Sequence, residues 1–402
     1  MLWKRLKKTV AAVLFFCMVW MGWTGNAAGS HTWFLTQKAE AAAKDKQTYT
    51  YEQTKKSLSA FRGVQADLDC IDLQIKPSAD SHEYLSYKLH CYNKKNPLHW
   101  QVKNGILYLE ESNFSPAIRK NGLAWTTSDT VTIYVPAEKV LNSFALHMGD
   151  GDLSINGMGQ EKGFCNSVSI VADTGDVAIA KQKFSGSASI ETKDGDLSLS
   201  DVRFSGSTKI STQVGDIAGR NVRAASSVSV STKDGDISFA DSAFSGSIFI
   251  QTQVGDIAGR NVQIKGSAKL LTDDGDISFV SSTLSGSTNV STKDGDIAGK
   301  LLRIPGTSVF STDDGDISLA TDDLSGRLKL RTADGDVEVA APEKVYKMLN
   351  ISLSTKDGEI SAKSYIGGRK SRNGGKLQYK KTIADSLAKL EIATECGDIS
   401  LR

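Results

Sequence analysis

A Gly-Asp pair recurs every twenty residues through much of this chain, and that regularity constrains the fold more than any other feature. The pair occurs nine times at this interval, from Gly175 to Gly335. A Thr lies three residues before most of these glycines, and an Ile, Leu or Val lies two residues after each. A strict period of this kind is typical of a repeat architecture, in which each repeat is one structural unit.

The repeat predicts an all-β, single-stack β-solenoid with one coil per twenty residues. A leucine-rich repeat would need its leucine frame, which is absent, and the two halves of a propeller blade should not match as these coils do. Outlying turns at Gly151, Gly358 and Gly397 bring the total to twelve. Strands stacked about 4.8 Å apart would give a rod of roughly 55 Å. We expect a right-handed coil, because parallel crossovers nearly always have that hand.

The coil between Gly235 and Gly255 shows which side chains should point inward. The predicted inward positions alternate along two short strands and one corner, and they are Ile237, Phe239, Phe244, Ile248, Ile250 and Thr252. A second period of forty residues is superimposed, in which small Gly219, Gly259 and Gly299 alternate with large Phe239, Phe279 and Leu319. We expect these large and small residues to interdigitate along the axis.

Composition divides the chain into four parts. Residues 1–41 are predicted as a secretory signal peptide or an N-terminal anchor, and residues 42–57 as a linker. Residues 58–148 alternate with period two and predict an N-terminal β cap or irregular first coils. Residues 149–402 hold the regular solenoid, with a basic, Gly-rich insertion at 367–375.

The first residues carry the signature of export. Four basic residues, starting with Lys4, precede an apolar run from Thr9 to Trp23. That run is shorter than the roughly 20 residues of a membrane span and fits the core of a signal peptide. Small-x-small cleavage motifs end at Ala27 and Ala41, and Cys17 follows a Phe, which does not suit a lipoprotein signal. We expect an exported surface, envelope or extracellular protein, with membrane association through this segment if it is retained.

The Gly-Asp turn itself allows a structural and a metal-binding interpretation. Glycine suits a corner with positive φ, and Asp accepts hydrogen bonds from turn amides. Stacked carboxylates repel one another, so Ca²⁺ between pairs such as Asp234 and Asp236 would be an alternative. Val214 and Val254 interrupt that pairing. We therefore predict a structural turn and no metal-binding or cofactor-binding residues.

The cysteines leave one question open. Cys70 and Cys91 lie in neighbouring alternating segments, and either a disulfide or two free thiols is compatible with an exported protein. Cys165 and Cys396 are far apart in the chain, and no CxxC motif or His/Cys cluster suggests zinc.

Composition and repeat together disfavour catalysis and nucleic-acid binding. The formal net charge is only +2, which is not that of a basic nucleic-acid reader. Between residues 149 and 340 the chain has no His, Trp or Tyr, so the usual general base and sugar-stacking rings are missing. A catalytic site occurs once in a protein, whereas these aspartates occur in every coil. We predict no catalytic residues.

An ice-binding or mineral-binding face is a further alternative, and it would need one outward column of identical Thr or Ser. The outward column fourteen residues after the glycine instead reads Lys209, Ser229, Phe249, Lys269, Asn289, Val309 and Lys329. No flat array follows from that column.

The sequence resembles the bacterial putative-adhesin domain family, an exported β-solenoid of unknown function. The likeness rests on Phe61-Arg62-Gly63-Val64, on Tyr134-Val135-Pro136, on the serial Ser-Thr-Lys-Asp-Gly-Asp-Ile-Ser coils and on the closing Gly397-Asp398-Ile399-Ser400-Leu401. The resemblance covers roughly residues 58–402 and implies adhesion, but it assigns no functional residue. The insertion at 367–375 departs from the family pattern.

Three functions remain open at this point. We predict a non-enzymatic surface or envelope protein whose rigid face binds a cell-surface polymer or another protein. The alternatives are an envelope-stress or signalling accessory protein and a β-helix carbohydrate-active enzyme.

Overall fold

The computed structural model describes residues 47–402, apart from 118, 122–123, 127–128 and 158–162. The chain divides into two units, residues 1–48 and 49–402, and the second contains the fold treated below. The protein is about 60% strand and 3% helix, so the predicted all-β solenoid fold is confirmed. Its handedness stays a prediction. The predicted signal peptide or anchor at 1–41, with its cleavage motifs and Cys17, lies outside the described residues.

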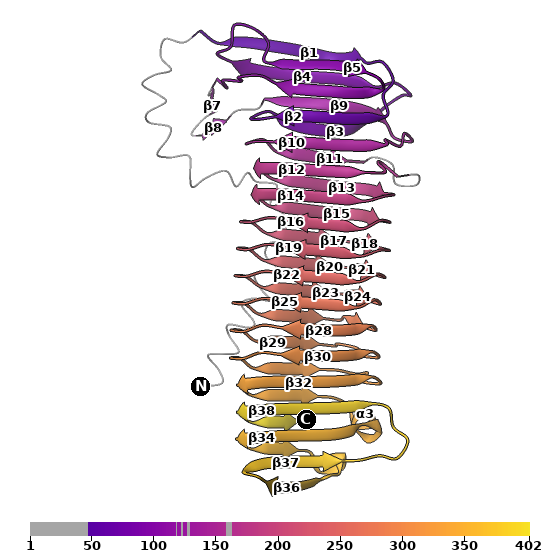
Figure 1. Ribbon diagram of the computed structural model, residues 1–402, viewed down its shortest axis with the longest axis vertical. Helices are drawn as coiled ribbons and strands as arrows, with labels where there is room; N and C mark the ends of the chain where they lie inside the picture. The colour runs from indigo at the N-terminus through magenta and orange to yellow at the C-terminus, as the bar shows by residue number, and fades with distance from the viewer. Residues whose placement is uncertain (1–46, 118, 122–123, 127–128, 158–162) are drawn as a thin grey trace. The chain divides into compact units, whose positions relative to one another are not determined.

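Two long sheets, called A and B below, form the two sides of the stack (Figure 1). Sheet A consists of β1 (Tyr49–Ser57), β3 (Asp72–Ser78), β4 (Tyr84–Cys91), β9 (Thr130–Pro136), β11 (Leu153–Asn156), β13 (Val177–Phe184), β15 (Leu197–Phe204), β17 (Ile217–Arg220), β18 (Arg223–Ala224), β20 (Ile237–Ala240), β21 (Ala243–Phe244), β23 (Ile257–Arg260), β24 (Gln263–Ile264), β26 (Ile277–Val280), β27 (Thr283–Leu284), β29 (Ile297–Lys300), β31 (Ile317–Ala320), β33 (Val337–Ala340), β35 (Ile360–Ala362) and β39 (Ile399–Leu401).

Sheet B consists of β2 (Gly63–Leu68), β5 (Leu98–Lys103), β6 (Ile106–Glu111), β10 (Ser143–Met148), β12 (Val168–Thr174), β14 (Ala188–Asp194), β16 (Thr208–Ser211), β19 (Val228–Ser231), β22 (Ile248–Gln251), β25 (Ala268–Leu271), β28 (Ser287–Ser291), β30 (Thr307–Ser311), β32 (Arg327–Asp334), β34 (Asn350–Asp357), β36 (Arg369–Asn373), β37 (Lys376–Lys381) and β38 (Lys389–Cys396). Outside the two sheets lie a small pair, β7 (Arg119–Asn121) with β8 (Ala124–Thr126), and two short helices, α3 (Glu343–Met348) and the 3-10 turn η1 (Ser364–Ile366).

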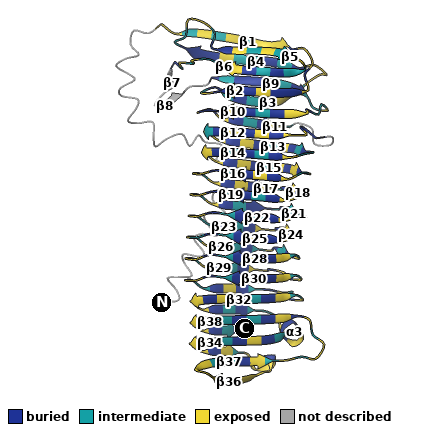
Figure 2. Ribbon diagram, viewed as in Figure 1, coloured by how far each residue is buried: buried dark blue, intermediate teal, exposed yellow. Residues whose placement is uncertain are grey.

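Residues twenty apart pair directly in the regular coils, so identical columns run along the stack. Ile237 lies opposite Ile217 on one side and Ile257 on the other, in parallel strands. Every predicted inward residue of the coil between Gly235 and Gly255 is buried, with Phe239 only 3% exposed and Thr252 only 1%. Buried and exposed positions alternate along the strands, and the core lies between the two sheets (Figure 2).

The predicted interdigitation of large and small residues is confirmed. Phe239 pairs with Gly219 in the coil before it and with Gly259 in the coil after it. A Cβ built on Gly219 would lie 2.4 Å from the ring of Phe239. The ring of Phe239 therefore occupies space that the neighbouring coil leaves empty, which explains the forty-residue period.

At the N-terminal end the coils do not stack in chain order. The first coil, β2 with β3, lies between the coil formed by β6 and β9 and the coil formed by β10 and β11. Strands β1, β4 and β5 then close this end by antiparallel pairing. Antiparallel capping strands leave no parallel coil edge open at this end.

The predicted linker at 42–57 is wrong for residues 49–57, which form β1. This strand pairs with β4 along most of its length. Alternate residues face the protein, and Tyr51 packs against the core while its hydroxyl donates a 3.0 Å hydrogen bond to the carbonyl of Asn93. The segment is polar in composition, yet backbone pairing with β4, the Tyr51 contacts and the Glu52–Lys88 ion pair hold it as a strand.

The C-terminal end repeats this departure from chain order. The last coil of the chain, β38 with β39, lies between the coil of β32 and β33 and the coil of β34 and β35 (Figure 1). The 367–375 insertion runs from the C-cap of η1 through β36 to the turn before β37. β37 pairs antiparallel with both β36 and β34. The helix α3 is six residues long and lies outside the regular coils.

Candidate binding face

The Gly-Asp turn leads from each sheet B strand to the next sheet A strand, and its backbone requires glycine. Gly235 has a φ of +146°, where residues with a Cβ are strained. A Cβ built on Gly235 would also lie 2.1 Å from the carbonyl oxygen of Gly215 in the preceding coil. The glycine column is explained by close stacking of the turns.

The aspartate after each glycine joins one coil to the next. Oδ1 of Asp216 accepts a 2.8 Å hydrogen bond from the backbone amide of Asp236, and Oδ1 of Asp236 accepts a 2.7 Å bond from that of Asp256. This ladder ends on the amide of Glu359, and its acceptors are Asp72, Asp152, Asp176, Asp196, Asp216, Asp236, Asp256, Asp276, Asp296, Asp316, Asp336 and Asp398. Turn amides thus satisfy one oxygen of each carboxylate.

The threonine column has a similar structural role. The hydroxyl of Thr252 donates to the carbonyl of Gly235, 3.0 Å away in the preceding coil, and to the carbonyl of Val254 at 3.1 Å. The Val254 carbonyl also accepts a hydrogen bond from the Gly235 amide, so the bond that links Thr252 to the Gly235 carbonyl is the one that adds a contact between coils. A small β-branched residue with a hydroxyl therefore suits this inward position.

The ladder retains electrostatic repulsion despite these bonds. Burial raises the pKa of Asp196 and of Asp256, and the neighbouring carboxylates raise it further, while the amide of the next coil opposes both effects. The absence of a metal at the turns stays a prediction. Each ladder hydrogen bond uses one carboxylate oxygen, and the second oxygen takes no part in the ladder.

Across the described residues, the one group of three potential metal ligands is Asp69, Cys70 and Glu111, away from the regular turns. Glu111 already accepts hydrogen bonds from the backbone amides of residues 69, 70 and 71. Burial raises the pKa of the Cys70 thiol to about 12, so the thiol is protonated at neutral pH. This cluster caps the end of β2 and needs no ion to explain it.

Cys70 and Cys91, the pair left open above, are free thiols in the structure. Cys91 is buried, and its Sγ lies 3.9 Å from the carbonyl oxygen of Asn93. Burial raises its pKa as well. Cys165 is buried and Cys396 exposed, and both are also free.

The outer face of sheet B carries a column that the sequence reasoning overlooked. Twelve residues after the turn glycine there is a Ser in six successive coils and then a Thr, and all seven are exposed: Ser187, Ser207, Ser227, Ser247, Ser267, Ser287 and Thr307. The constant spacing of twenty residues was the signal that could have revealed it. The column two residues further on, which was considered, also faces outward.

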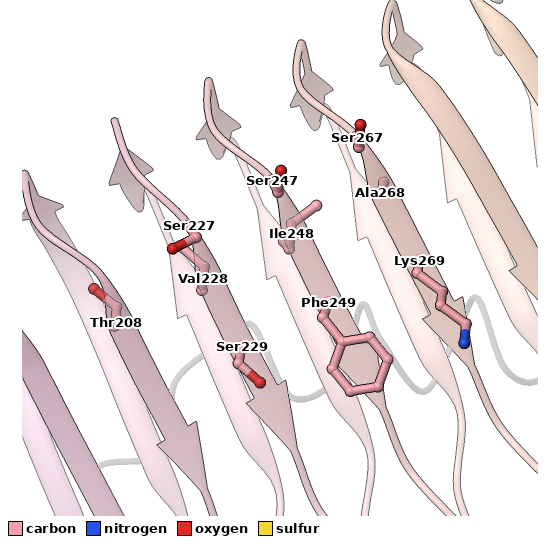
Figure 3. A pocket seen from close by; sticks show the side chains of 10 residues that line it. All are labelled: Thr208, Ser227, Val228, Ser229, Ser247, Ile248, Phe249, Ser267, Ala268 and Lys269. Atoms are coloured by element: carbon pink, nitrogen blue, oxygen red, sulfur yellow. The ribbon is translucent and has the colours of Figure 1, made fainter.

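One groove interrupts this face, at β16, β19, β22 and β25 (Figure 3). It has a volume of about 370 Å³ and is lined by Thr208, Ser227, Val228, Ser229, Ser247, Ile248, Phe249, Ser267, Ala268 and Lys269. Phe249 lies between Ser229 and Lys269 on the adjacent strands. The Nζ of Lys269 is 5.9 Å from the centre of the Phe249 ring. The short serine side chains leave room beside this ring.

Phe249 is the one aromatic residue in its column. An aromatic ring, a cation and several hydroxyls on one rigid surface offer stacking, charge and hydrogen bonding to a ligand. The lining contains no Asp, Glu or His, hence no acid–base pair. The arrangement can bind a ligand, and Lys269 is the one ionisable side chain in its lining.

The sequence profile of the Toastrack DUF4097 family matches residues 65–226 and 221–402. Since these matches cover most of the chain, the protein belongs to this family, a domain of unknown function. The resemblance to a family of adhesin-like solenoid domains is thereby confirmed. No curated protein matches the sequence.

Three solved structures match the chain at low sequence identity and with low TM-scores. A putative cell adhesion protein from Clostridium sporogenes is 9% identical, with 88% of this chain and 99% of that chain covered and a TM-score of 0.16. A putative adhesin from Bacteroides fragilis is 13% identical, with coverages of 89% and 98% and a TM-score of 0.18. A putative lipid binding protein from Parabacteroides distasonis is 14% identical, with coverages of 74% and 94% and a TM-score of 0.22.

Within the described part of the chain, no helix has both the length and the apolar character needed to cross a membrane.

Proposed function

We propose that this protein is a non-enzymatic, exported surface protein that binds a linear polysaccharide along the outer face of sheet B. The observation that carries the proposal is the groove at Phe249, the one aromatic residue of a variable outward column that runs beside the continuous serine column. A binding site occurs once, so the position in this column that carries an aromatic ring is the best candidate.

The chemistry of the groove suits a sugar chain. A pyranose ring has one apolar face that can lie on Phe249, and its hydroxyls can exchange hydrogen bonds with Ser229 and Ser247. Adjacent strands are about 4.8 Å apart, a spacing close to the length of one sugar unit. A polymer running along the stack would therefore meet equivalent serines at successive units.

The rigidity of the stack also favours binding to an extended polymer. Inward columns are fully packed and each coil is hydrogen-bonded to its neighbours, so the face is held in shape before a ligand arrives. A preformed surface loses little conformational entropy on binding. Lys269 adds a preference for sugars that carry carboxylates or phosphates.

Export is supported by the basic and apolar residues before Trp23, and non-enzymatic action by the lining of the groove. A surface location would place the serine face in contact with cell-wall or extracellular glycans. Serine hydroxyls without a partner base do not act as nucleophiles.

The test is affinity electrophoresis of the full chain through gels that contain single soluble polysaccharides, both neutral and acidic. We expect at least one polysaccharide to retard the protein and Phe249→Ala to abolish the retardation. Val309→Ala, in the same outward column three coils away, is the matched control and should migrate as the wild type. If no polysaccharide retards the protein, or if both variants behave alike, the proposal is wrong.

A further inference from the structure

The C-terminal hairpin concentrates positive charge. Between Glu359 and Asp385 the chain has no acidic residue, and it has seven basic ones: Lys363, Arg369, Lys370, Arg372, Lys376, Lys380 and Lys381. Six of these are exposed, and Lys381 is half-buried. Among the described residues, none of the seven forms an ion pair with an acidic side chain, although Lys363 lines a pocket together with Glu338 and Glu359. The positive charge is therefore concentrated on β36 and β37.

Cross-strand pairing places like charges opposite one another. Arg369 lies opposite Lys380 in the antiparallel pairing of β36 with β37. Like charges in that position destabilise a hairpin. Lys381 lies near Lys347 of α3. Burial is the larger cause that lowers the pKa of Lys381, and the positive charge of Lys347 lowers it further. The hairpin is held by Tyr379, which is buried beneath Gly368.

Exposed apolar side chains lie beside this charge. Leu387 is 80% exposed, Met348 is 56% exposed and Tyr365 is 40% exposed. The hydroxyl of Ser386 bonds to the carbonyl of Met348, which holds the Leu387 loop against the end of α3. The Lys381 ammonium bonds to the carbonyl of Tyr346, which joins the same region to the end of β37.

Protection of a sheet edge explains only part of this arrangement. β36 pairs only with β37, and lysine or arginine on such an edge prevents sheets from joining. Exposed Leu, Met and Tyr have the opposite effect, because they favour association. Basic residues that flank apolar and aromatic side chains are instead typical of proteins that lie on a membrane surface.

We propose that the C-terminal surface formed by the β36–β37 hairpin, the end of α3 and the Leu387 loop binds an anionic lipid bilayer. The cations contact lipid phosphates, and Leu387, Met348 and Tyr365 enter the interface between headgroups and acyl chains. β36 is the last strand of the stack (Figure 1), and Met348 and Leu387 lie just before β34 and β38, so this surface covers the edge of the stack where those strands begin. The proposal is independent of the polysaccharide site.

The first experiment is co-sedimentation of the full chain with vesicles of phosphatidylcholine alone or with about one third phosphatidylglycerol, at low and high salt. The wild type should bind the anionic vesicles more tightly, and salt should weaken that binding. Each cation near the surface contributes about fivefold in affinity, so Arg369→Ser/Arg372→Ser/Lys376→Ser should weaken it about a hundredfold. The control Arg203→Ser/Arg223→Ser/Lys300→Ser removes three exposed charges from sheet A and should bind as the wild type.

A second variant distinguishes a lipid bilayer from a soluble anionic polymer as the partner. Met348→Ser/Leu387→Ser should weaken vesicle binding but leave the salt dependence unchanged, and thermal melts should show that both variants remain folded. When anionic vesicles are added, hydrogen exchange should slow at residues 365–387 and stay unchanged in β14–β17. Slower exchange at residues 365–387 would show that this surface, and not the N-terminal segment, contacts the vesicles. Equal binding to both lipid mixtures, a hairpin variant that binds like the wild type, or full binding by the Met348/Leu387 variant overturns the proposal. The last result would indicate a soluble anionic polymer as the partner.

Discussion

The backbone amide of Asp236 lies 2.8 Å from the carboxylate oxygen of Asp216, one coil earlier, and donates a hydrogen bond to it. The relation repeats along the turns, so each aspartate is both an acceptor for the next coil and a donor to the previous one. Stacking, and not only the local turn, therefore accounts for the aspartate after each glycine.

This relationship predicts how changes at Asp236 affect stability. Asp236→Asn retains an oxygen that can accept the Asp256 amide and removes repulsion, so it should cost little. Asp236→Ala leaves that amide without its partner and should cost about 1 kcal/mol. Denaturant unfolding of both variants measures the difference. If Asn is as harmful as Ala, the negative charge itself is needed, and a bound cation becomes the better explanation.

Calcium should not affect the stability of the protein. If turn amides are sufficient, the melting temperature of the wild type should be the same with chelator and with millimolar calcium. A ligand that bound only the folded state would raise the melting temperature with concentration. A calcium-dependent rise that Asp236→Asn abolishes would show that the ladder is a metal site.

The half-buried Asp256 predicts an unusual pH dependence. The pKa of Asp256 is raised in the folded protein, mainly by burial, so its contribution to stability is present at acid pH and is lost as pH rises through the raised pKa. Asp256→Asn should therefore stabilise more, or destabilise less, at neutral pH than near pH 3.8, the ordinary pKa of the group. Thermal melts of wild type and variant at the two pH values measure this.

Asp173 provides the control of opposite sign. A hydrogen bond from Lys193 lowers its pKa, so its contribution is present at neutral pH and is lost as pH falls. Asp173→Asn should be most harmful at neutral pH and nearly neutral in acid. If both variants respond to pH in the same direction, the assignment of burial as the cause at Asp256 is wrong.

The alternation of Phe239 with glycine predicts coupling between coils. Phe239→Ala should cost about 3–5 kcal/mol, because it leaves a cavity in a packed core. Gly219→Ala should cost about 1–3 kcal/mol, because its Cβ would clash with the ring of Phe239. In the Phe239→Ala background the same glycine change should be harmless, and this double-mutant cycle measures the coupling. Ser229→Ala, on the outer face, should have almost no effect on stability.

The order of coils at the C-terminal end predicts the result of truncation. In a chain that ends at residue 388, the strands β34 and β35 lose β38 and β39, through which they are hydrogen-bonded to β32 and β33. Hydrogen-exchange protection should then be lost in β34–β37 and kept in β12–β30. A chain that ends at residue 340 should keep the same central protection. Retained protection of β34 in the first truncation would contradict the observed order.

Sequence reasoning succeeded where the repeat itself carried the information. The inward positions, the interdigitation of Phe239 with glycine and the structural role of the glycines all follow from residues that recur in register. It failed at β1, where Tyr51 orders a polar segment that reads as a linker, and it overlooked the exposed serine column beside Phe249. The column recurs every twenty residues in the sequence, so its regularity is a property of the repeat.

The coil follows from the repeat alone, because an interval of twenty residues can bury the same columns in every turn only if the turns stack directly on one another. The tertiary structure alone decided the order of coils at the two ends. One coil presents nearly the same hydrogen-bonding edge as any other, so periodicity cannot tell which coil lies beside which. Packing of the end strands selects the arrangement, and it places β38 between β32 and β34 and the basic hairpin at the end of the stack.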